Sequence, residues 1–215
     1  SLARQNVNGA IAGDLDVKGG VDADCLRTGC SSIAKSLECA IAICQILGHK
    51  SFEEEWRIAH AKLIRAIENP AGIFDLKKDR SRFSMDSYYP IIGGISTKNI
   101  VSSLMSNIKT SFWIKGLGIK CVSDEPWITV AETSECSIAF KKIGEDDIAL
   151  ELLHNAIAIV DSNSIPYMGW QYEENIFWPE EKPSWTSAAL IIAADTVLDY
   201  SDASDLFIKD QSILY

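Results

Sequence analysis

Apolar positions recur at helical spacing in seven segments of the chain, and these segments are of two kinds. Residues 31–47 are apolar on nearly every face, which predicts a helix that is buried all round, and residues 184–198 are expected to form a further apolar helix. Residues 51–67 instead carry a single apolar stripe, which predicts an outer, half-exposed helix. The other expected helices are a short inner one at residues 86–94, a further inner one at 128–143, and outer ones at 97–112 and 146–160.

No segment of any length alternates apolar and polar residues with the period of a strand, so the sequence predicts an all-α protein. Short turns at residues 48–51 and 144–145 follow inner helices, whereas long loops precede them. Repeated helical hairpins of this kind are typical of an (α/α) toroid, in which inner helices face an axis and outer helices face water. With four inner and three outer helices, this chain is expected to form an incomplete ring. We therefore expect residues 1–215 to be one toroid domain or its C-terminal part, with residues 1–27 as an irregular lead-in.

Composition limits the possible partners and the location of the protein. With 47% hydrophobic and 23% charged residues, the chain has the profile of a globular protein with a sizeable core. The formal net charge of −10 and the scattered Lys and Arg residues argue against binding to nucleic acid or to an anionic membrane surface. No apolar run reaches the roughly 18 residues that span a bilayer, and no signal-peptide pattern is present, so we expect a cytoplasmic protein without a membrane span. A start at Ser1 rather than Met suggests that a preceding segment has been removed.

The cysteines and histidines do not have the spacing of a metal site. The six cysteines include no C-x-x-C pair, and Cys39, Cys44 and Cys136 fall within helical patterns, so we interpret them as small buried residues. The three histidines lie on or beside predicted helices and are not spaced as zinc ligands. We expect neither a metal nor another cofactor.

The segment KCVSDEPWITVAETSEC concentrates charge at a predicted helix start. Its turn holds Asp124, Glu125 and Trp127, and the pair Thr129 and Glu132 matches a capping box. The partial positive charge of a helix N-terminus favours ionised carboxylates. If the function can be inferred from any part of this sequence, it is from this segment.

In a toroid, the N-termini of the inner helices point to one face. That face would bring together the segment above, Lys35, the run around Asp86, and the start of the last helix. The long loop at residues 161–183 adds further aromatic and acidic side chains. Glu135 lies on the apolar stripe of its own helix, so we expect its carboxylate to pair with Lys35 or with a tyrosine hydroxyl.

Four strings of this chain resemble a known group of proteins: SSIAKSLECAIA, RFSMDSYYPIIGG, GLGIKCVSDEPWITVAETSEC and FWPEEKPSWTSAALIIAAD. They are similar to bacterial and archaeal prenyltransferase-like proteins, which are placed among the α/α toroids of the terpenoid-cyclase and six-hairpin-glycosidase kind. The resemblance covers most of residues 26–208 and implies a toroid fold, without implying particular catalytic residues. Where that group tends to have a DGSYWTG-like segment, this chain has SNSIPYMGWQY.

The residue types at the proposed face favour a sugar-active enzyme. A glycosidase needs two carboxyl groups roughly 5 to 9.5 Å apart, and aromatic rings on which sugar faces stack. We select Asp86 and Glu132 as the catalytic pair, with Glu125 as a substitute for either. Two structural alternatives stay open, because Glu132 would also serve as the capping partner of Thr129 and Asp86 as an N-cap.

Around this pair we expect side chains that bind the substrate. A negative, aromatic-rich cleft suits a neutral or cationic sugar. Three of the side chains also have structural alternatives, since Glu181 would favour the positive end of the last helix and Trp127 and Trp185 would seal hairpin junctions. The full predicted binding set is Lys35, Tyr88, Tyr89, Asp124, Trp127, Trp170, Trp178, Glu181 and Trp185.

Two other functions stay open. An isoprenoid substrate is favoured by the prenyltransferase-like resemblance, although the sequence has neither an Asp/Cys/His zinc site nor the acidic D-x-D-D string of a class II terpene cyclase. A toroid that only binds a ligand is the third possibility, because fold does not settle function. A carboxyl group with its pKa raised towards neutral would separate an enzyme from a binding protein.

Overall fold

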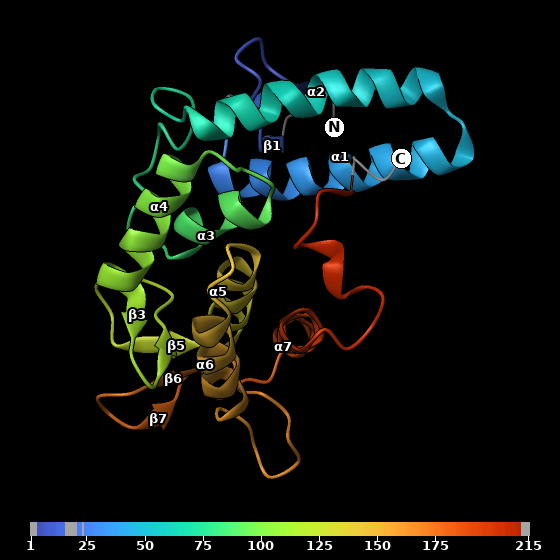
Figure 1. Ribbon diagram of the computed structural model, residues 1–215. Helices are drawn as coiled ribbons and strands as arrows, with labels where there is room; N and C mark the ends of the chain where they lie inside the picture. Colours follow the sequence, from blue (N-terminus) through green and yellow to red (C-terminus); the bar gives the residue numbers. More distant parts are fainter. Residues whose placement is uncertain (1–3, 16–20, 23, 212–215) are drawn as a thin grey trace. The chain divides into compact units, whose positions relative to one another are not determined.

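The computed structural model of the protein describes residues 4–15, 21–22 and 24–211 (Figure 1). Its chain divides into two compact units, which are described separately. Unit 1 comprises residues 1–80, 89–101 and 210–215, and unit 2 comprises residues 81–88 and 102–209.

Each of the seven predicted helices is present near its expected position, so the helical periodicity is confirmed. The differences are at the ends: the helix expected from residue 31 begins at Arg27, the one expected to reach residue 160 ends at Ile157, and the segment expected at 97–112 finishes as a π-helix at Ile108–Phe112. The helices are α1 (Arg27–Leu47), α2 (Lys50–Glu68), α3 (Met85–Ile92), α4 (Lys98–Asn107), α5 (Val130–Lys142), α6 (Asp146–Ile157) and α7 (Ser184–Leu198).

The expectation of an all-α protein is wrong in detail, because seven short strands join the helices. A three-stranded antiparallel sheet has the order β5–β6–β7, with Trp127 opposite Gln171 and Trp170 opposite Phe177. Two hairpins, β1–β2 and β3–β4, account for the other strands. Strands of two or three residues are too short to show a period of two in the sequence. The strands are β1 (Asp14–Leu15), β2 (Val21–Asp22), β3 (Trp113–Ile114), β4 (Gly118–Ile119), β5 (Trp127–Thr129), β6 (Gly169–Gln171) and β7 (Ile176–Phe177).

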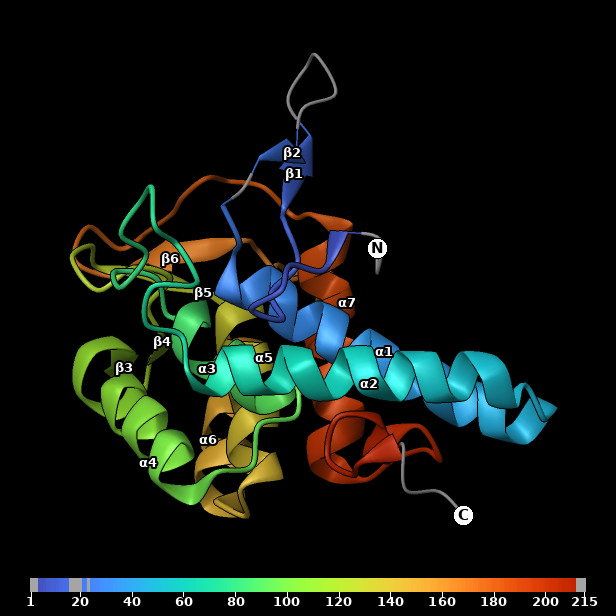
Figure 2. The same ribbon diagram turned by 90° about the horizontal axis from the view of Figure 1, so that it is seen from above.

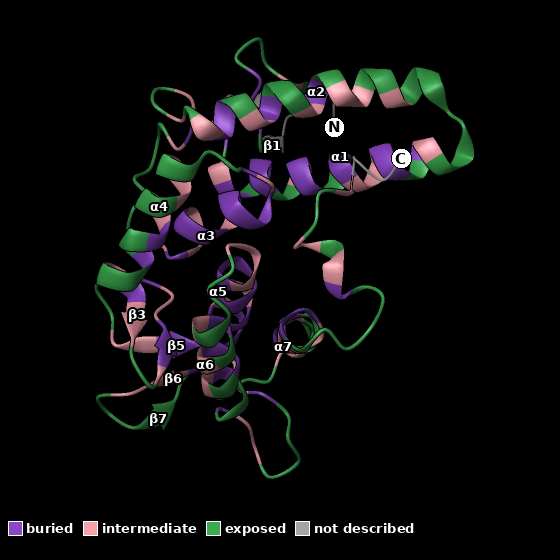
Figure 3. Cartoon of the chain, viewed as in Figure 1, coloured by how far each residue is buried: buried purple, intermediate pink, exposed green. Residues whose placement is uncertain are grey.

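In unit 1, α1 and α2 form an antiparallel hairpin that is visible in both views (Figures 1 and 2). The turn depends on Gly48, whose left-handed backbone (φ 72°) a residue with a Cβ adopts only at a cost. α2 buries one stripe and leaves the rest exposed, as its pattern predicted (Figure 3).

The centre of α1 holds a buried ion pair. Lys35 is 5% exposed and Glu38 is 2% exposed, and the Lys35 ammonium lies 2.5 Å from a Glu38 carboxylate oxygen. The same carboxylate accepts a hydrogen bond from the backbone N–H of Gln211 at 2.8 Å. The two polar interruptions of this apolar helix therefore satisfy each other inside unit 1.

In unit 2, α5 is the central helix. Nine of its residues are buried, and α6 and α7 both pack against it. Gly144, with φ 81°, forms the tight turn between α5 and α6 that the sequence predicted. Burial on nearly every side agrees with the expectation of an inner helix (Figure 3).

The expectation that the helix at residues 31–47 is buried all round is wrong, and the apolar α7 is partly exposed as well. Side chains at the end of α1 are exposed, with Ile46 at 70%, and α7 exposes Ile191 at 67% and Leu198 at 57%. A uniformly apolar pattern shows that a helix can be buried, but neighbours must be present to cover each face. In the part of the chain that the structure describes, these faces lack such neighbours.

Among the described helices, α1 alone is long enough and apolar enough to cross a membrane, judged by length and composition. Half of its most apolar window is buried inside the fold, as in the core helix of a soluble protein. Its buried Lys35 and Glu38 pair agrees with a core position, because charges in a helix interior need a partner close by. The absence of a membrane span stays a prediction.

Gly169 provides a test of the β5–β6 packing. A Cβ at this position would lie 2.5 Å from the Trp127 indole nitrogen and 2.7 Å from the Ile128 carbonyl oxygen, closer than real Cβ contacts. We expect Gly169→Ala to lower the free energy of unfolding by about 1–3 kcal/mol, the usual cost of overpacking. Urea denaturation would measure it. The control is Gly29→Ala on α1, where the nearest atom to a new Cβ is 3.7 Å away and stability should hold or rise. Equal urea midpoints for the two variants would contradict the close packing of Gly169 against β5.

Candidate functional site

The segment between β4 and β5 is held against the start of α3 by backbone hydrogen bonds. The Cys121 carbonyl accepts from the Ser84 N–H at 3.0 Å and from the Ser84 hydroxyl at 3.3 Å, and the Ser123 N–H donates to the Arg82 carbonyl at 2.9 Å. On its other side, the Cys121 N–H donates to the Trp127 carbonyl at 3.2 Å. These bonds join the segments that carry the predicted carboxylates, within unit 2.

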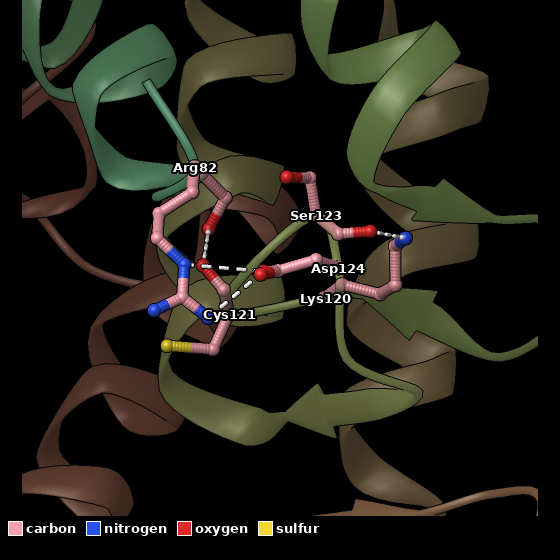
Figure 4. A network of polar contacts seen from close by, with 6 residues as sticks. Arg82, Lys120, Cys121, Ser123 and Asp124 are labelled. Atoms are coloured by element: carbon pink, nitrogen blue, oxygen red, sulfur yellow. Dashed lines mark hydrogen bonds and ion pairs between the residues drawn. The ribbon is translucent and has the colours of Figure 1, made fainter. Parts of the chain in front are cut away.

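Asp124 forms an exposed ion pair at this segment. One of its carboxylate oxygens accepts from the Arg82 Nε at 3.1 Å and from a terminal nitrogen at 2.9 Å (Figure 4). The Arg82 guanidinium lowers the pKa of Asp124. Lys120 adds a hydrogen bond from its ammonium to the Ser123 carbonyl. Asp124 is therefore ionised and paired with Arg82. The ion pair gives Asp124 a role in ordering the loop.

Asp86 and Glu132 each lie in the first turn of a helix, α3 and α5 respectively, and both are half-buried. Asp86 follows Ser84 by two residues, and Ser84 is bonded to Cys121. Glu132 lies beside the Cys121 thiol on the other side. Glu132 thus adjoins this segment through its side chain, and Asp86 is two residues along the backbone from a residue bonded to it, whereas Glu125 is exposed in the loop that follows.

The raised pKa of the Cys121 thiol indicates that Glu132 lies close to it. Burial raises the pKa of Cys121 to about 12, and the charge of Glu132 and a hydrogen bond to its carboxylate add to the increase. The thiol is therefore protonated at neutral pH and available as a donor to Glu132. Sequence analysis missed this pair, because a lone half-buried cysteine has no distinguishing pattern.

Neither Glu132 nor Asp86 has the capping role that the sequence had left open. Thr129 occupies the N-cap position of α5, but its side chain makes no capping hydrogen bond, so the predicted capping box with Glu132 is wrong. Thr129 ends β5, where it pairs with Gly169, and its buried hydroxyl makes no hydrogen bond with the residues that the structure describes. Asp86 lies inside the first turn of α3 rather than ahead of it, so it is not the N-cap.

Glu135 has the partner that the sequence suggested. The hydroxyl of Tyr88 donates to a Glu135 carboxylate oxygen at 2.9 Å, which confirms the expected tyrosine. Tyr88 itself is completely buried, so its ring offers no surface to a sugar. We correct its predicted role from substrate binding to the core, where it links α3 to α5.

Two of the predicted binding residues belong to unit 1 and are described apart from the carboxylates of unit 2. Lys35 is buried in its ion pair with Glu38 and is not exposed to a substrate. Tyr89 is half-buried in the part of α3 that belongs to unit 1.

The remaining predicted aromatic residues lie around the β5–β6–β7 sheet and the start of α7. Trp127 and Trp178 meet edge to face, with ring centroids 5.9 Å apart, and the Trp127 indole N–H donates to the Trp178 carbonyl at 2.6 Å. Trp170 packs against the core cluster that contains Ile128. Trp185 is 53% exposed in the first turn of α7, close in sequence to the exposed Glu181.

A second aromatic pair near this sheet was not selected from the sequence. Tyr167 and Phe177 are stacked, with centroids 4.0 Å apart and planes 8° from parallel. Lys182 lies over the Tyr167 ring at 5.3 Å and forms an ion pair with Asp161 at 2.6 Å. This hydrogen bond from Lys182 lowers the pKa of Asp161 to about 2. The available signal was the run of three large apolar residues, Ile176 to Trp178, inside a charged loop.

The described residues do not bring together three or more His, Cys, Asp or Glu side chains in a way that could hold a metal ion. The six cysteines are free thiols. Cys25, Cys30, Cys44 and Cys136 are buried, as expected for small core residues, and the other two are half-buried.

The Cys121–Glu132 contact can be tested by thiol reactivity. Replacing Glu132 with Gln removes the charge that helps to raise the pKa of Cys121, so its thiolate fraction at alkaline pH should increase. We expect faster alkylation of Cys121 by iodoacetamide between about pH 8 and 11, followed by peptide mass spectrometry. Cys39 in α1 is the internal control, with an unchanged profile. An unchanged Cys121 profile would contradict the contact.

Comparison with known proteins supports the sugar-active interpretation. No family model matches the chain. The chain is 33% identical over 188 residues to a protein of Mycolicibacterium hassiacum named MMP endo-(1,4)-3-O-methyl-alpha-D-mannosidase. The match covers 87% of this chain and 51% of the relative, so the chain spans about half the length of that protein. The similarity supports a glycosidase-like enzyme and gives no support to the prenyltransferase-like grouping.

Proposed function

We propose that the protein takes part in hydrolysis of α-linked mannose chains that carry O-methyl groups, cutting at internal bonds. The observation that carries the proposal is the 33% identity to an endo-mannosidase across 87% of the chain. The aligned length is half of the relative, so the activity of a complete enzyme is itself part of the proposal.

The carboxylates in the first turns of α3 and α5 suit this chemistry. Glycoside hydrolysis needs one carboxyl group as general acid for the leaving oxygen and a second, ionised, as base or nucleophile. We assign the role of base or nucleophile to Glu132, because the Cys121 thiol lies beside its carboxylate and the residue sits in the first turn of α5. Asp86 takes the role of acid, with Glu125 as the substitute for either.

Groups around the pair would hold it in place. The Arg82–Asp124 ion pair and the Ser84 bonds to Cys121 fix the segment that lies between the two helices. The Tyr88–Glu135 hydrogen bond ties α3 to α5 one turn further along each helix. A fixed separation of the carboxyl groups matters because it selects between a direct displacement by water and a covalent intermediate.

We also propose the toroid as the finer description of the fold. The α1–α2 and α5–α6 hairpins, each closed by a left-handed glycine, are the repeating unit that a toroid requires. α7 packs on both α5 and α6, as the next inner helix of such a ring would.

An isoprenoid ligand is the second candidate function, because α7 borders an apolar hollow. The hollow has a volume of about 640 Å³ and includes Ile191, Leu198 and Phe207 in its lining. Asp195 is the charged residue in this lining, which contains no Lys or Arg among the described residues. A diphosphate group would need cations there. The hollow therefore favours an uncharged chain over a prenyl diphosphate.

The catalytic assignment is tested with α-(1→4)-linked 3-O-methylmannose oligosaccharides as substrate. We expect Asp86→Asn and Glu132→Gln each to lower kcat by about 10²–10⁴, the usual contribution of general acid–base catalysis. Asp147→Asn, an exposed carboxylate in the first turn of α6, is the matched control and should keep full activity. Product chain lengths, separated by chromatography, would distinguish internal from terminal cleavage.

Two outcomes would contradict this assignment. Full activity of both variants together with loss in Glu125→Gln would transfer a catalytic role to Glu125. Failure of the folded wild-type chain to release product from these oligosaccharides would overturn the proposed function.

A further inference from the structure

Three consecutive apolar side chains at β7 are exposed to solvent: Ile176 at 45%, Phe177 at 41% and Trp178 at 60%. Single exposed apolar residues are common on soluble proteins, whereas contiguous ones mark binding surfaces. Phe177 and Trp178 lie beside two further rings. We call these four residues the aromatic ribbon: Trp127, Tyr167, Phe177 and Trp178.

The rings of the aromatic ribbon are held in place by their neighbours. The indole N–H of Trp127 is bonded to the Trp178 carbonyl at 2.6 Å, and the two rings meet at 67°. Phe177 is stacked on Tyr167, and its backbone is paired with Trp170 across the sheet. Preorganised rings lose little conformational freedom when a ligand binds, which favours affinity.

The cation that lies over the Tyr167 ring of the ribbon is already paired. Lys182, over the Tyr167 ring, is bonded to Asp161 at 2.6 Å. A cation that is occupied in this way is a poor partner for a phosphate or carboxylate of a ligand. The exposed Glu173, Glu174 and Glu181 of the same loop add negative charge, so the apolar rings of the ribbon suit a neutral ligand better than an anionic one.

The ribbon is continuous with the proposed catalytic segment. Trp127 is the first residue of β5, and β5 leads directly into the first turn of α5, where Glu132 lies. The ribbon and Glu132 belong to the same unit. A long ligand bound near Glu132 would therefore extend onto the ribbon.

We propose that the aromatic ribbon is a binding subsite for an O-methylated α-mannose chain, at sugar residues beyond the bond that is cleaved. This proposal rests on the proposed function. A methyl ether replaces a hydroxyl donor with apolar surface, and burying that surface against an aromatic face is favourable. The subsite would therefore prefer methylated over unmethylated chains.

The test measures binding by isothermal titration calorimetry in a Glu132→Gln background, so that the ligand is not consumed. The ligands are long and short α-(1→4)-mannose oligosaccharides, each with and without 3-O-methyl groups. We expect Trp178→Ala and Phe177→Ala to raise the Kd for the long methylated chain by about tenfold. Trp178→Phe, which keeps an aromatic face, should recover most of that loss.

A matched control is Phe52→Ala on α2, where the phenyl ring is 53% exposed but lies outside the ribbon. It should bind every ligand as the Glu132→Gln parent does. Circular dichroism and thermal unfolding would establish that each variant is folded. The Trp178→Ala change keeps the backbone carbonyl that accepts from Trp127, so the loop retains this bond.

The outcomes separate this proposal from the proposed function. Equal affinity of the parent and the Trp178→Ala variant for the long methylated chain would overturn the subsite. Equal affinity of the parent for methylated and unmethylated chains would overturn it as well. Ribbon-dependent binding, combined with no hydrolysis by the wild-type chain, would support the subsite and overturn the proposed function.

Discussion

Burial of α5 is the constraint on which the rest of unit 2 depends. Its residues face α6 on one side and α7 on another, and the β5–β6–β7 sheet begins immediately before it. A helix enclosed in this way cannot rotate without breaking several sets of contacts. The orientation of its first turn, and so of Glu132, is thereby set by packing that lies far from any substrate.

The two chemical features of unit 2 follow from what precedes α5 in the chain. Upstream of β5, the Cys121 segment brings the start of α3 next to Glu132. At β5 itself, Trp127 turns towards the long loop and meets Trp178. Trp127 and Glu132 therefore come from one continuous segment, whereas Asp86 comes from α3 and the other rings of the ribbon come from the loop before α7.

Helical periodicity was enough to locate the helices, because each one buries a stripe or a face that leaves a trace in the sequence. The strands left no such trace, since two or three residues cannot display an alternation. Asp86 and Glu132 do lie in the first turns of α3 and α5, near where the sequence placed them, but the capping box at Thr129 was misread, because a residue that ends a strand can share the composition of a cap. The Cys121–Glu132 contact and the Tyr167–Phe177 stack depend on tertiary approach, which sequence spacing does not encode.

The bond between Gln211 and Glu38 joins residues 173 positions apart, and it has a consequence for synthesis of the protein. Unit 1 takes its parts from three separate stretches of the chain, and the two stretches of unit 2 lie between them. During synthesis, the Glu38 carboxylate would therefore gain this partner only after a further 173 residues had been made.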